Sequence, residues 1–316
     1  MLQITDLTKR FKKFQVLKGL NMNIGKGEIY GFLGKNGCGK TTTMNIICDI
    51  IPKDGGSVAF SALGERRKIG YLTEQPALHG FMDGYEYLEY IAACANYKGD
   101  VNRRIHETLE LVGMLEGARR RIKNYSRGMN QRLGIAAAIF DSPHLLILDE
   151  PTSALDPEGR AEVMKIIQRL KAEGTTIILC THIISDVERV ADKIGILHDG
   201  VIAEEGYIDD IIRKHQKNYS RIMIKLAEPN ADFASLMRGN PLVAASSYNP
   251  KTGQVILDSE NADALYDALL ALIIQNRIRF SEFINQSTTL EDIYIAVTGG
   301  GFSLGKGFPR GEGEAV

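Results

Sequence analysis

Apolar residues in this chain gather in short runs, and the spacing within each run predicts a structural element. Three runs, at residues 28–33, 144–148 and 175–180, are almost continuously apolar. Such runs are typical of strands that helices cover on both faces. Residues 83–121 instead carry apolar positions at helical spacing, as in Leu88 with Ile91 and Ile105 with Leu109. This alternation predicts an α/β fold with a buried sheet and a helical subdomain.

The pattern changes after Tyr207. A linking helix is expected over 208–216, followed by strand-like segments and helical segments that alternate as in a small α+β domain. The strand-like segments are 222–226, 242–247, 254–257 and 277–284, and the helical ones are 231–238, 262–274 and a last helix from Thr289. We therefore expect a first domain over 1–215, with its helical subdomain at about 83–140, and a second over 216–298. The glycine-rich residues 299–316 are expected to form a flexible tail.

A glycine-rich segment between the first apolar run and a helix carries the clearest chemistry. Residues 34–42 read GKNGCGKTT and fit the phosphate-loop pattern at Gly34, Gly39, Lys40 and Thr41. Glycines let successive N–H groups turn toward an anion, and the helix that follows adds its positive end. We expect Lys40 to reach the β- and γ-phosphates and Thr41 to bind Mg²⁺. The alternative is a glycine-rich surface loop without a ligand. The expected nucleotide-binding residues here are Gly34, Asn36, Gly37, Cys38, Gly39, Lys40, Thr41 and Thr42.

Two carboxylates end the second apolar run, at Asp149 and Glu150. Ligands of open α/β sheets bind beyond the carboxyl ends of the strands, which predicts that both acids lie beside the phosphate loop. Asp149 is then expected to help hold Mg²⁺, and Glu150 to accept a proton from the water that attacks the γ-phosphate. Either acid alone would suit a helix cap or a surface charge.

Residues 124–132 contain Ser126 and Gly128 directly before an alanine-rich helical stretch. A hydroxyl, backbone N–H groups and a helix dipole together can form a second anion site. Taken in isolation, a Ser-x-Gly sequence at a helix start is more often a simple cap.

Composition excludes several other functions. The net charge is −1, with 38 basic and 39 acidic residues, so no cationic field is available for nucleic acid, and Arg119 to Arg121 are interpreted as a solvated face. No apolar run approaches the roughly 18 residues of a membrane span, and no signal core is present, which favours the cytoplasm. The four cysteines lack metal-site spacing and suit a reducing compartment. Cys38, inside the phosphate loop, is a candidate reactive thiol near the nucleotide.

The order of these motifs resembles the ATPase subunit of ATP-binding cassette transporters over residues 1–215. Under this resemblance residues 34–42 match the Walker A loop, 125–129 the family signature, 145–150 Walker B and 153–156 the D-loop. His182, which follows the third apolar run, matches the switch histidine that contacts the γ-phosphate. Phe11 stands where the family has an aromatic that stacks on adenine, although a core phenylalanine is an equal alternative.

The resemblance implies ATP and Mg²⁺ as ligands and two kinds of partner. In this family two ATPase subunits close head to tail, so Ser126 and Gly128 would serve the nucleotide held by a second copy of the chain. Separately encoded transmembrane permease subunits would bind the helical subdomain, which places the protein on the cytoplasmic face of the membrane. The aromatic and leucine residues that recur at helical spacing in that subdomain could equally pack against one another in its own core. The C-terminal domain, with Thr-Leu-Glu-Asp at 289–292, is similar to extensions of exporter-type members.

Three positions depart from the family pattern. The signature reads YSRGM where LSGGQ is commonest, and Cys38 replaces the usual alanine or serine. Glu74 falls where the family has the Q-loop glutamine, with Gln75 one position later, so either is the candidate ligand that faces Mg²⁺ and water.

A soluble cassette ATPase without a transport role, or a regulatory nucleotide-binding module, is the alternative function. The transported substrate stays open, because membrane subunits on another chain select it.

Overall fold

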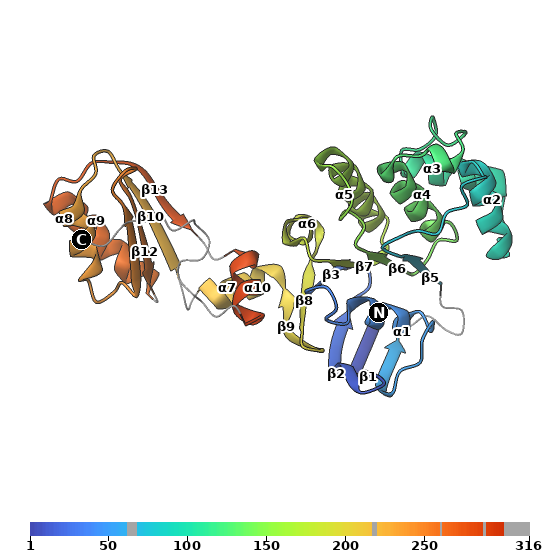
Figure 1. Cartoon of the computed structure of the whole chain (residues 1–316), viewed down its shortest axis with the longest axis horizontal. Coiled ribbons are helices and arrows are strands. Elements are labelled where there is room, and N and C mark those ends of the chain that lie inside the picture. The colour runs from blue at the N-terminus through green and yellow to red at the C-terminus, as the bar shows by residue number, and fades with distance from the viewer. Residues whose placement is uncertain (62–67, 217–219, 260, 287–288, 300–316) are drawn as a thin grey trace. The chain divides into compact units, whose positions relative to one another are not determined.

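The computed structural model describes residues 1–61, 68–216, 220–259, 261–286 and 289–299 (Figure 1). The chain divides by contacts into two units, Met1–Ile208 and Asp209–Val316. The division therefore falls at the start of helix α7 (Ile208–Gln216). The sequence analysis places the boundary at the other end of this helix.

A six-stranded sheet organises the first unit, in the order β5-β6-β7-β3-β8-β9. The first five of these strands run parallel, and β9 pairs antiparallel with β8. Every residue of β3, β6 and β7 is buried, which explains their continuous apolar sequences. The bounds are β3 Ile29–Leu33, β5 Ile69–Leu72, β6 Leu145–Asp149, β7 Thr176–Thr181, β8 Lys193–His198 and β9 Val201–Tyr207.

A second, antiparallel sheet covers helix α1 (Lys40–Ile47) from the other side. Its order is β2-β1-β4, with β1 at Leu2–Phe11, β2 at Phe14–Ile24 and β4 at Gly55–Phe60. One hydrophobic core joins both sheets and the helix, and includes Leu17 of β2, Met44 of α1 and Ile147 of β6. The helix that follows the phosphate loop is thus fixed on two sides.

The remaining helices of the first unit lie on the opposite face of the central sheet (Figure 1). They are α2 Gly84–Cys94, α3 Val101–Leu111, the short 3₁₀ helix η1 Ile122–Asn124, α4 Arg127–Ile139, α5 Pro157–Ala172 and α6 Ile184–Val190. Helix α2 begins at a capping box in which Asp83 accepts from the amide of Glu86 while the Glu86 carboxylate accepts from the amide of Asp83. The helical subdomain expected from the apolar spacing thus corresponds to α2, α3 and α4.

The second unit contains a four-stranded antiparallel sheet in the order β11-β12-β10-β13. Together with helices α8 and α9, these strands follow the chain order β-α-β-β-α-β, the ferredoxin-like arrangement. Both helices pack on one face of the sheet, around Phe233 and Leu265. The bounds are β10 Ser220–Leu226, α8 Ala231–Arg238, β11 Ala245–Asn249, β12 Gln254–Ser259, α9 Ala262–Gln275, β13 Phe280–Gln286 and the last helix α10 Leu290–Val297.

Two strands of this unit begin later than the sequence predicts. Strand β11 starts at Ala245 because residues 240–243 form a turn in which the Asn240 carbonyl accepts from Val243. Strand β13 starts at Phe280 because Arg277, with a φ of 50°, ends helix α9 instead of opening a strand. The tail predicted to be flexible lies outside the described residues from residue 300 onward.

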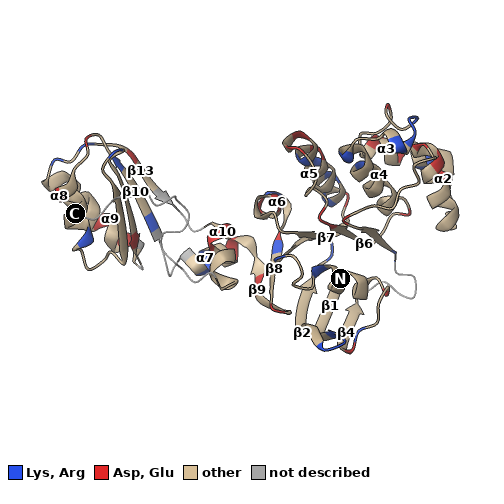
Figure 2. Ribbon diagram, viewed as in Figure 1, with Lys and Arg blue, Asp and Glu red and all other residues tan. Residues whose placement is uncertain are grey.

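Lysine and arginine positions alternate with acidic ones over both units (Figure 2). Within the described ranges, no helix combines the length and the apolar character that a membrane crossing requires.

Candidate functional site

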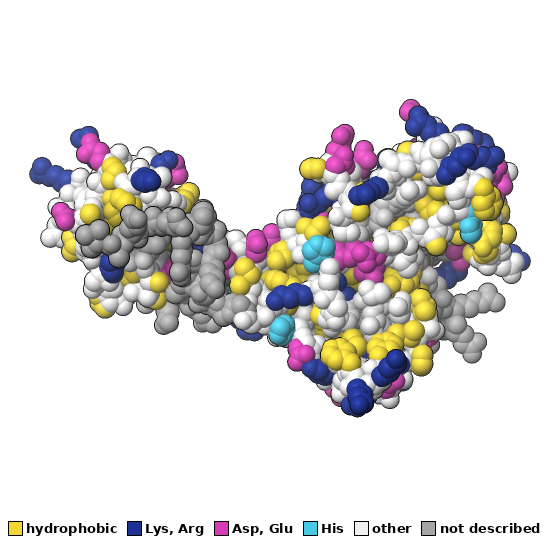
Figure 3. Space-filling view, viewed as in Figure 1, with side chains coloured by type: hydrophobic (Ala, Val, Ile, Leu, Met, Phe, Trp, Pro, Cys, Tyr) yellow, Lys and Arg dark blue, Asp and Glu magenta, His cyan; other side chains and the backbone are white. Residues whose placement is uncertain are grey.

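Three neighbouring parallel strands bring the candidate residues to one edge of the central sheet. The phosphate loop follows β3, Asp149 and Glu150 end β6, and Thr181 and His182 end β7, which lies between the other two. The register pairs Asp149 with Cys180 and Leu33 with Thr181, so these ends are level with one another. Acidic side chains gather beside a histidine in the region of β6 and β7 in the space-filling view (Figure 3).

The phosphate loop has the backbone that its glycines predict. Gly39 has a φ of 114°, in the left-handed region that disfavours other residues, and it is the N-cap of α1. A Cβ on Gly34 would lie 2.9 Å from the carbonyl oxygen of Leu197, so the loop passes too close to β8 for a side chain. Asn36 and Gly37 are exposed at the turn. The first amides of α1 have no acceptor within the helix and form the anion-binding end.

Lys40 points back into the loop. Its Nζ donates to the carbonyl oxygen of Gly34 at 2.6 Å and lies 3.5 Å from that of Lys35. The same Nζ lies 3.7 Å from Oε1 of Glu150, and both side chains are buried. The ammonium therefore connects the phosphate loop to the carboxylate at the end of β6.

Thr41 and Asp149 form the candidate metal site. The Thr41 hydroxyl donates to Oδ2 of Asp149 at 2.9 Å. Burial raises the pKa of the Asp149 carboxyl above its ordinary value, and the hydrogen bond from Thr41 opposes this effect. Two hard oxygen ligands suit Mg²⁺, which commonly takes one or two protein ligands together with phosphate oxygens and water. The residues present thus fit Mg²⁺ bound along with a nucleotide.

Glu74 does not form a metal-binding cluster with the other acids of this site. Its charge contributes to the raised pKa of Asp149, yet in the described residues no three His, Cys, Asp or Glu side chains are close enough together to hold a metal by themselves. Both Glu74 and Gln75 are exposed, and the Gln75 carbonyl accepts from the Thr73 hydroxyl. The structure therefore leaves both Glu74 and Gln75 as candidates for the Q-loop position.

Glu150 is the best-held acid of the site. Its side chain is 7% exposed, and its φ of 50° is unusual for a residue that is not glycine. The backbone N–H donates to the Cys180 carbonyl at 2.8 Å, and the carboxylate accepts from Thr181 at 3.3 Å. Nδ1 of His182 lies 2.9 Å from Oε1 of Glu150. Because an ionised carboxylate cannot donate, we assign the proton of this contact to His182.

Hydrogen bonds among the residues that follow Glu150 in the chain fix the local backbone. Ser153 donates its hydroxyl to the Glu150 carbonyl at 3.2 Å, and Asp156 caps helix α5. The buried Asp186 accepts from Thr152 at 2.6 Å and from Arg160 at 2.9 Å. Sequence reasoning identified Ser153 and Asp156 only through the family resemblance and missed the hydrogen bonds of Asp186, since no local pattern relates residues so far apart in the chain.

The aromatic candidate is on the surface, so the alternative of a core phenylalanine is wrong. Phe11 is 47% exposed and pairs across the β1–β2 turn with Phe14, which is 67% exposed and was missed by the sequence analysis. Strand β2 then passes against the phosphate loop, since a Cβ on Gly39 would lie 3.1 Å from Cγ1 of Val16. The two rings therefore lie on a hairpin that contacts the phosphate loop.

Cys38 does not have the environment of an activated thiol. Burial raises its pKa, and the neighbouring Lys40 offsets only part of this rise. A reactive thiol is instead one whose pKa is lowered. The structure therefore gives no support to the interpretation of Cys38 as a reactive residue.

Ser126 and Gly128 are not brought to the phosphate loop of their own chain. Ser126 is the exposed N-cap of α4, and its hydroxyl accepts from the Met129 amide at 3.2 Å. Helix α4 packs on the face of the sheet opposite α1 (Figure 1). A Cβ on Gly128 would meet only the Ser126 hydroxyl, at 3.9 Å, so nothing in the described chain requires glycine there.

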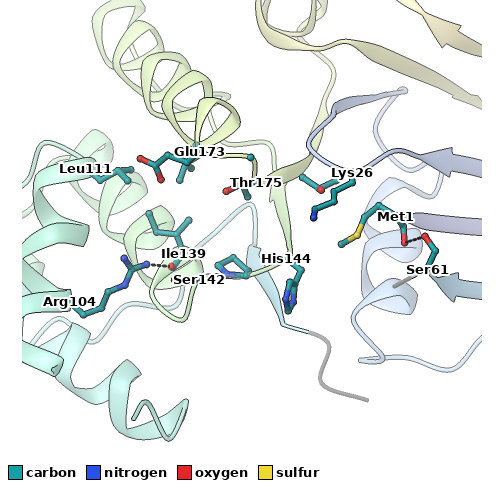
Figure 4. Close-up of a pocket in the computed structure, with 14 residues that line it drawn as sticks. Met1, Lys26, Ser61, Arg104, Leu111, Ile139, Ser142, His144, Glu173 and Thr175 are labelled. Carbon is teal, nitrogen blue, oxygen red and sulfur yellow. Dashed lines mark hydrogen bonds between the residues drawn. The ribbon is translucent and has the colours of Figure 1, made fainter. Parts of the chain in front are cut away.

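A separate cavity of about 560 Å³ lies at the opposite edge of the sheet (Figure 4). Its lining includes Lys26, His144 and Thr175, each of which precedes a strand of the sheet, together with Arg104. Arg104 uses its guanidinium to bind the carbonyls of Ile139 and Phe140 at the end of α4. Ligands of parallel sheets bind at the carboxyl ends of strands, so this cavity is not the candidate site.

Comparison with known proteins agrees with this geometry. A family model described as ABC transporter matches residues 17–153. The bacitracin transport ATP-binding protein BcrA of Enterococcus faecalis is 32% identical over 316 residues, which cover 95% of this chain and 97% of that protein. The lantibiotic transport ATP-binding protein SrtF of Streptococcus pyogenes is 40% identical over 212 residues, or 66% of this chain and 91% of that protein.

A solved structure extends the comparison to three dimensions. It is a dimeric ATP-binding cassette in a post-hydrolysis state with ADP and Pi bound. It aligns with a TM-score of 0.59 and 27% identity, and the alignment covers 66% of this chain and 98% of that one.

Proposed function

The chain belongs to the ABC transporter family, as an ATP-binding subunit that hydrolyses ATP with Mg²⁺, and we propose from this premise that it drives an exporter by closing head to tail on a second copy. The observation that carries the proposal is the position of Ser126 and Gly128. Both lie at an exposed helix start, away from the phosphate loop of their own chain, and Gly128 leaves open space in front of it. A phosphate bound to another copy would fit this space.

The residues at the carboxyl edge have distinct roles in this proposal. Lys40 and the first amides of α1 bind the phosphates, and Phe11 stacks on adenine, with Phe14 beside it. Thr41 and Asp149 hold Mg²⁺, which neutralises phosphate charge during the reaction. Glu150 accepts a proton from the attacking water, and His182 turns from Glu150 to the γ-phosphate when nucleotide is present.

Closure and hydrolysis alternate in this mechanism. Donors from both copies bind the same γ-phosphate, so the ATP-bound dimer is stable and the product state is not. Cleavage removes the group that both surfaces share, and the copies separate. This two-state element converts hydrolysis into movement of the attached membrane subunits.

We further propose that the helical subdomain binds those membrane subunits, on the cytoplasmic face of the membrane. A groove of about 540 Å³ lies between β5, α2 and α4 and includes Tyr87 and Ile91 in its lining. Tyr87 also contacts His79, which stacks on Phe81 at 5.6 Å, and Phe81 is 70% exposed. A groove of mixed polar and apolar lining with an exposed aromatic residue nearby suits a short helix of a permease.

The exporter assignment and the domain division rest on the length of the similarity. The bacitracin transport relative aligns with 95% of this chain, including the second unit. The lantibiotic transport relative aligns over 91% of its own length with only 66% of this chain. We therefore propose a cassette domain up to residue 215 and an accessory domain over 216–298, and a peptide antibiotic as the class of substrate. A regulatory module without hydrolysis is not favoured by the intact Glu150 site.

Glu150→Gln tests the closure. The substitution removes the proton acceptor and keeps the phosphate donors, so ATP with Mg²⁺ should convert the variant to a dimer in size-exclusion chromatography with light scattering. Adding Ser126→Ala should weaken this dimer, whereas adding Ser235→Ala, an exposed serine in α8 of the second unit, should not.

A mixing experiment tests the head-to-tail arrangement itself. Copies carrying Glu150→Gln with Lys40→Met, and copies carrying Glu150→Gln with Ser126→Ala, should each form less dimer with ATP than Glu150→Gln alone. Mixed together, they restore one complete site, in which the intact loop of the second copy meets the intact Ser126 of the first. Absence of a mixed dimer, with the Glu150→Gln dimer present, would contradict the arrangement.

A further inference from the structure

The carboxylate of Glu150 is held by a residue to which the sequence analysis gave no role. Thr181 ends strand β7, directly before His182, and its side chain is fully buried. Its hydroxyl donates to Oε2 of Glu150 at 3.3 Å. The pairing of β6 with β7 brings the two residues together, because Asp149 lies opposite Cys180 and the Glu150 amide donates to the Cys180 carbonyl.

A second hydrogen bond also holds the Thr181 hydroxyl. The Thr181 oxygen accepts from the backbone N–H of Ile183 at 3.0 Å, a local turn between residues two apart. A hydroxyl has a single proton, and within the described part of the chain its only acceptor is Glu150. The amide of Ile183, the hydroxyl and the carboxylate thus form a chain in which every donor points toward Glu150.

The two carboxylate oxygens are consequently different. Oε2 is occupied by a buried hydroxyl that cannot leave without losing both of its hydrogen bonds. Oε1 faces His182 at 2.9 Å and Lys40 at 3.7 Å, the two groups expected to move toward the phosphate. When those groups turn to the nucleotide, Oε1 becomes the oxygen that is free to accept a proton.

We infer that Thr181 is a positioning residue for hydrolysis, which holds Oε2 of Glu150 so that Oε1 faces the attacking water. The inference rests on the proposed role of Glu150 as the proton acceptor. Thr181 touches neither the phosphates nor the water and acts through the carboxylate alone. A misdirected base slows the chemical step and leaves nucleotide affinity unchanged.

The experiment compares steady-state ATP hydrolysis by the full chain with that of Thr181→Val, which keeps the shape and removes the hydroxyl. We expect kcat to fall about tenfold or more, since a hydrogen bond to a charged group is lost, while KM changes less than about twofold. Thr181→Ser should restore kcat to within about threefold of the wild type.

Thr176→Val is the matched control. Thr176 is buried at the other end of the same strand, and its hydroxyl likewise accepts from a backbone N–H, that of Gly27 at 2.9 Å. This variant loses a comparable hydrogen bond far from the site and should keep kcat. A kcat for Thr181→Val equal to that of Thr176→Val, or a loss that serine does not restore, would overturn the inference.

Two further comparisons keep the test decisive. If Thr181→Val does not fold, Thr181→Ser and Thr181→Ala lose the same methyl group and differ only in the hydroxyl, so the ratio of their kcat values answers the question. In the background of Glu150→Gln, Thr181→Val should have no further effect. If Glu150→Gln itself hydrolyses ATP normally, the proposed role of Glu150 fails. If it stalls while Thr181→Val does not, only the role of Thr181 fails.

Discussion

Lys40→Met should weaken ATP binding by about 100-fold while the fold is kept. The ammonium has three N–H donors, and in the structure one is held firmly by the Gly34 carbonyl at 2.6 Å. The other two face only long contacts, at 3.5 Å to the Lys35 carbonyl and 3.7 Å to Glu150. Those two donors are therefore available to phosphate oxygens at little cost to the loop.

The magnitude follows from these two donors. A hydrogen bond that involves a charged group contributes about 1.5–3 kcal/mol, and the two together would exceed about 3 kcal/mol if fully realised. Part of this is offset, because in the wild type Lys40 must give up its contact with Glu150 when it turns to the phosphates, a cost that the variant does not have. We take about 3 kcal/mol as the expected loss, which corresponds to a Kd about 100-fold higher. The thioether of methionine fills most of the space, so the packing of α1 is preserved.

Titration of a fluorescent ATP analogue against the full chain measures this loss. Lys26→Met is the control, because Lys26 is exposed at the opposite edge of the sheet and lines the other cavity. Thermal unfolding followed by circular dichroism should show that both variants fold. The reasoning would be refuted by a Kd for Lys40→Met within about threefold of the wild type, or by an equal loss in Lys26→Met.

Three other predictions follow from buried groups. Because burial raises the pKa of Asp149, the folded chain without ligand favours the protonated carboxyl. The contribution of this proton to the free energy of unfolding is complete below the unfolded-state pKa and is lost as pH rises through the folded-state pKa. Mg²⁺ competes with that proton, so Mg²⁺-dependent ATP binding should strengthen as pH rises through the folded-state pKa of Asp149, and Asp149→Asn should reduce this dependence in the same titration. Burial raises the pKa of Cys48 to about 12, so a maleimide at about pH 8 should label the exposed Cys94 and leave Cys48 unlabelled until denaturant is added, as peptide mass spectrometry would show. Phe233→Ala should destabilise the second unit by about 3–5 kcal/mol without changing the Kd for ATP, and a shift in both would show that the two units do not fold separately.

Much of the nucleotide site could be predicted from the sequence because its motifs are local. The phosphate loop needs glycine at Gly39 for the left-handed backbone, and lysine directly after it, so the pattern itself carries the geometry. The same holds for the three buried strands, whose continuous apolar residues reflect cover on both faces. Phe14 escaped prediction because exposure of a ring on a hairpin depends on what packs beside it.

The amino-acid sequence by itself determined which elements form and in what order, together with the presence of a phosphate loop, because these depend on neighbours within a few residues. The tertiary structure alone decided which side chains meet. The registers of β6 with β7 and of β3 with β7 bring Lys40, Thr181 and His182 within hydrogen-bonding or ion-pair distance of Glu150, and they leave Ser126 on the far side of the sheet. Strand order and register arise from the packing of the whole core, and no local sequence pattern encodes them.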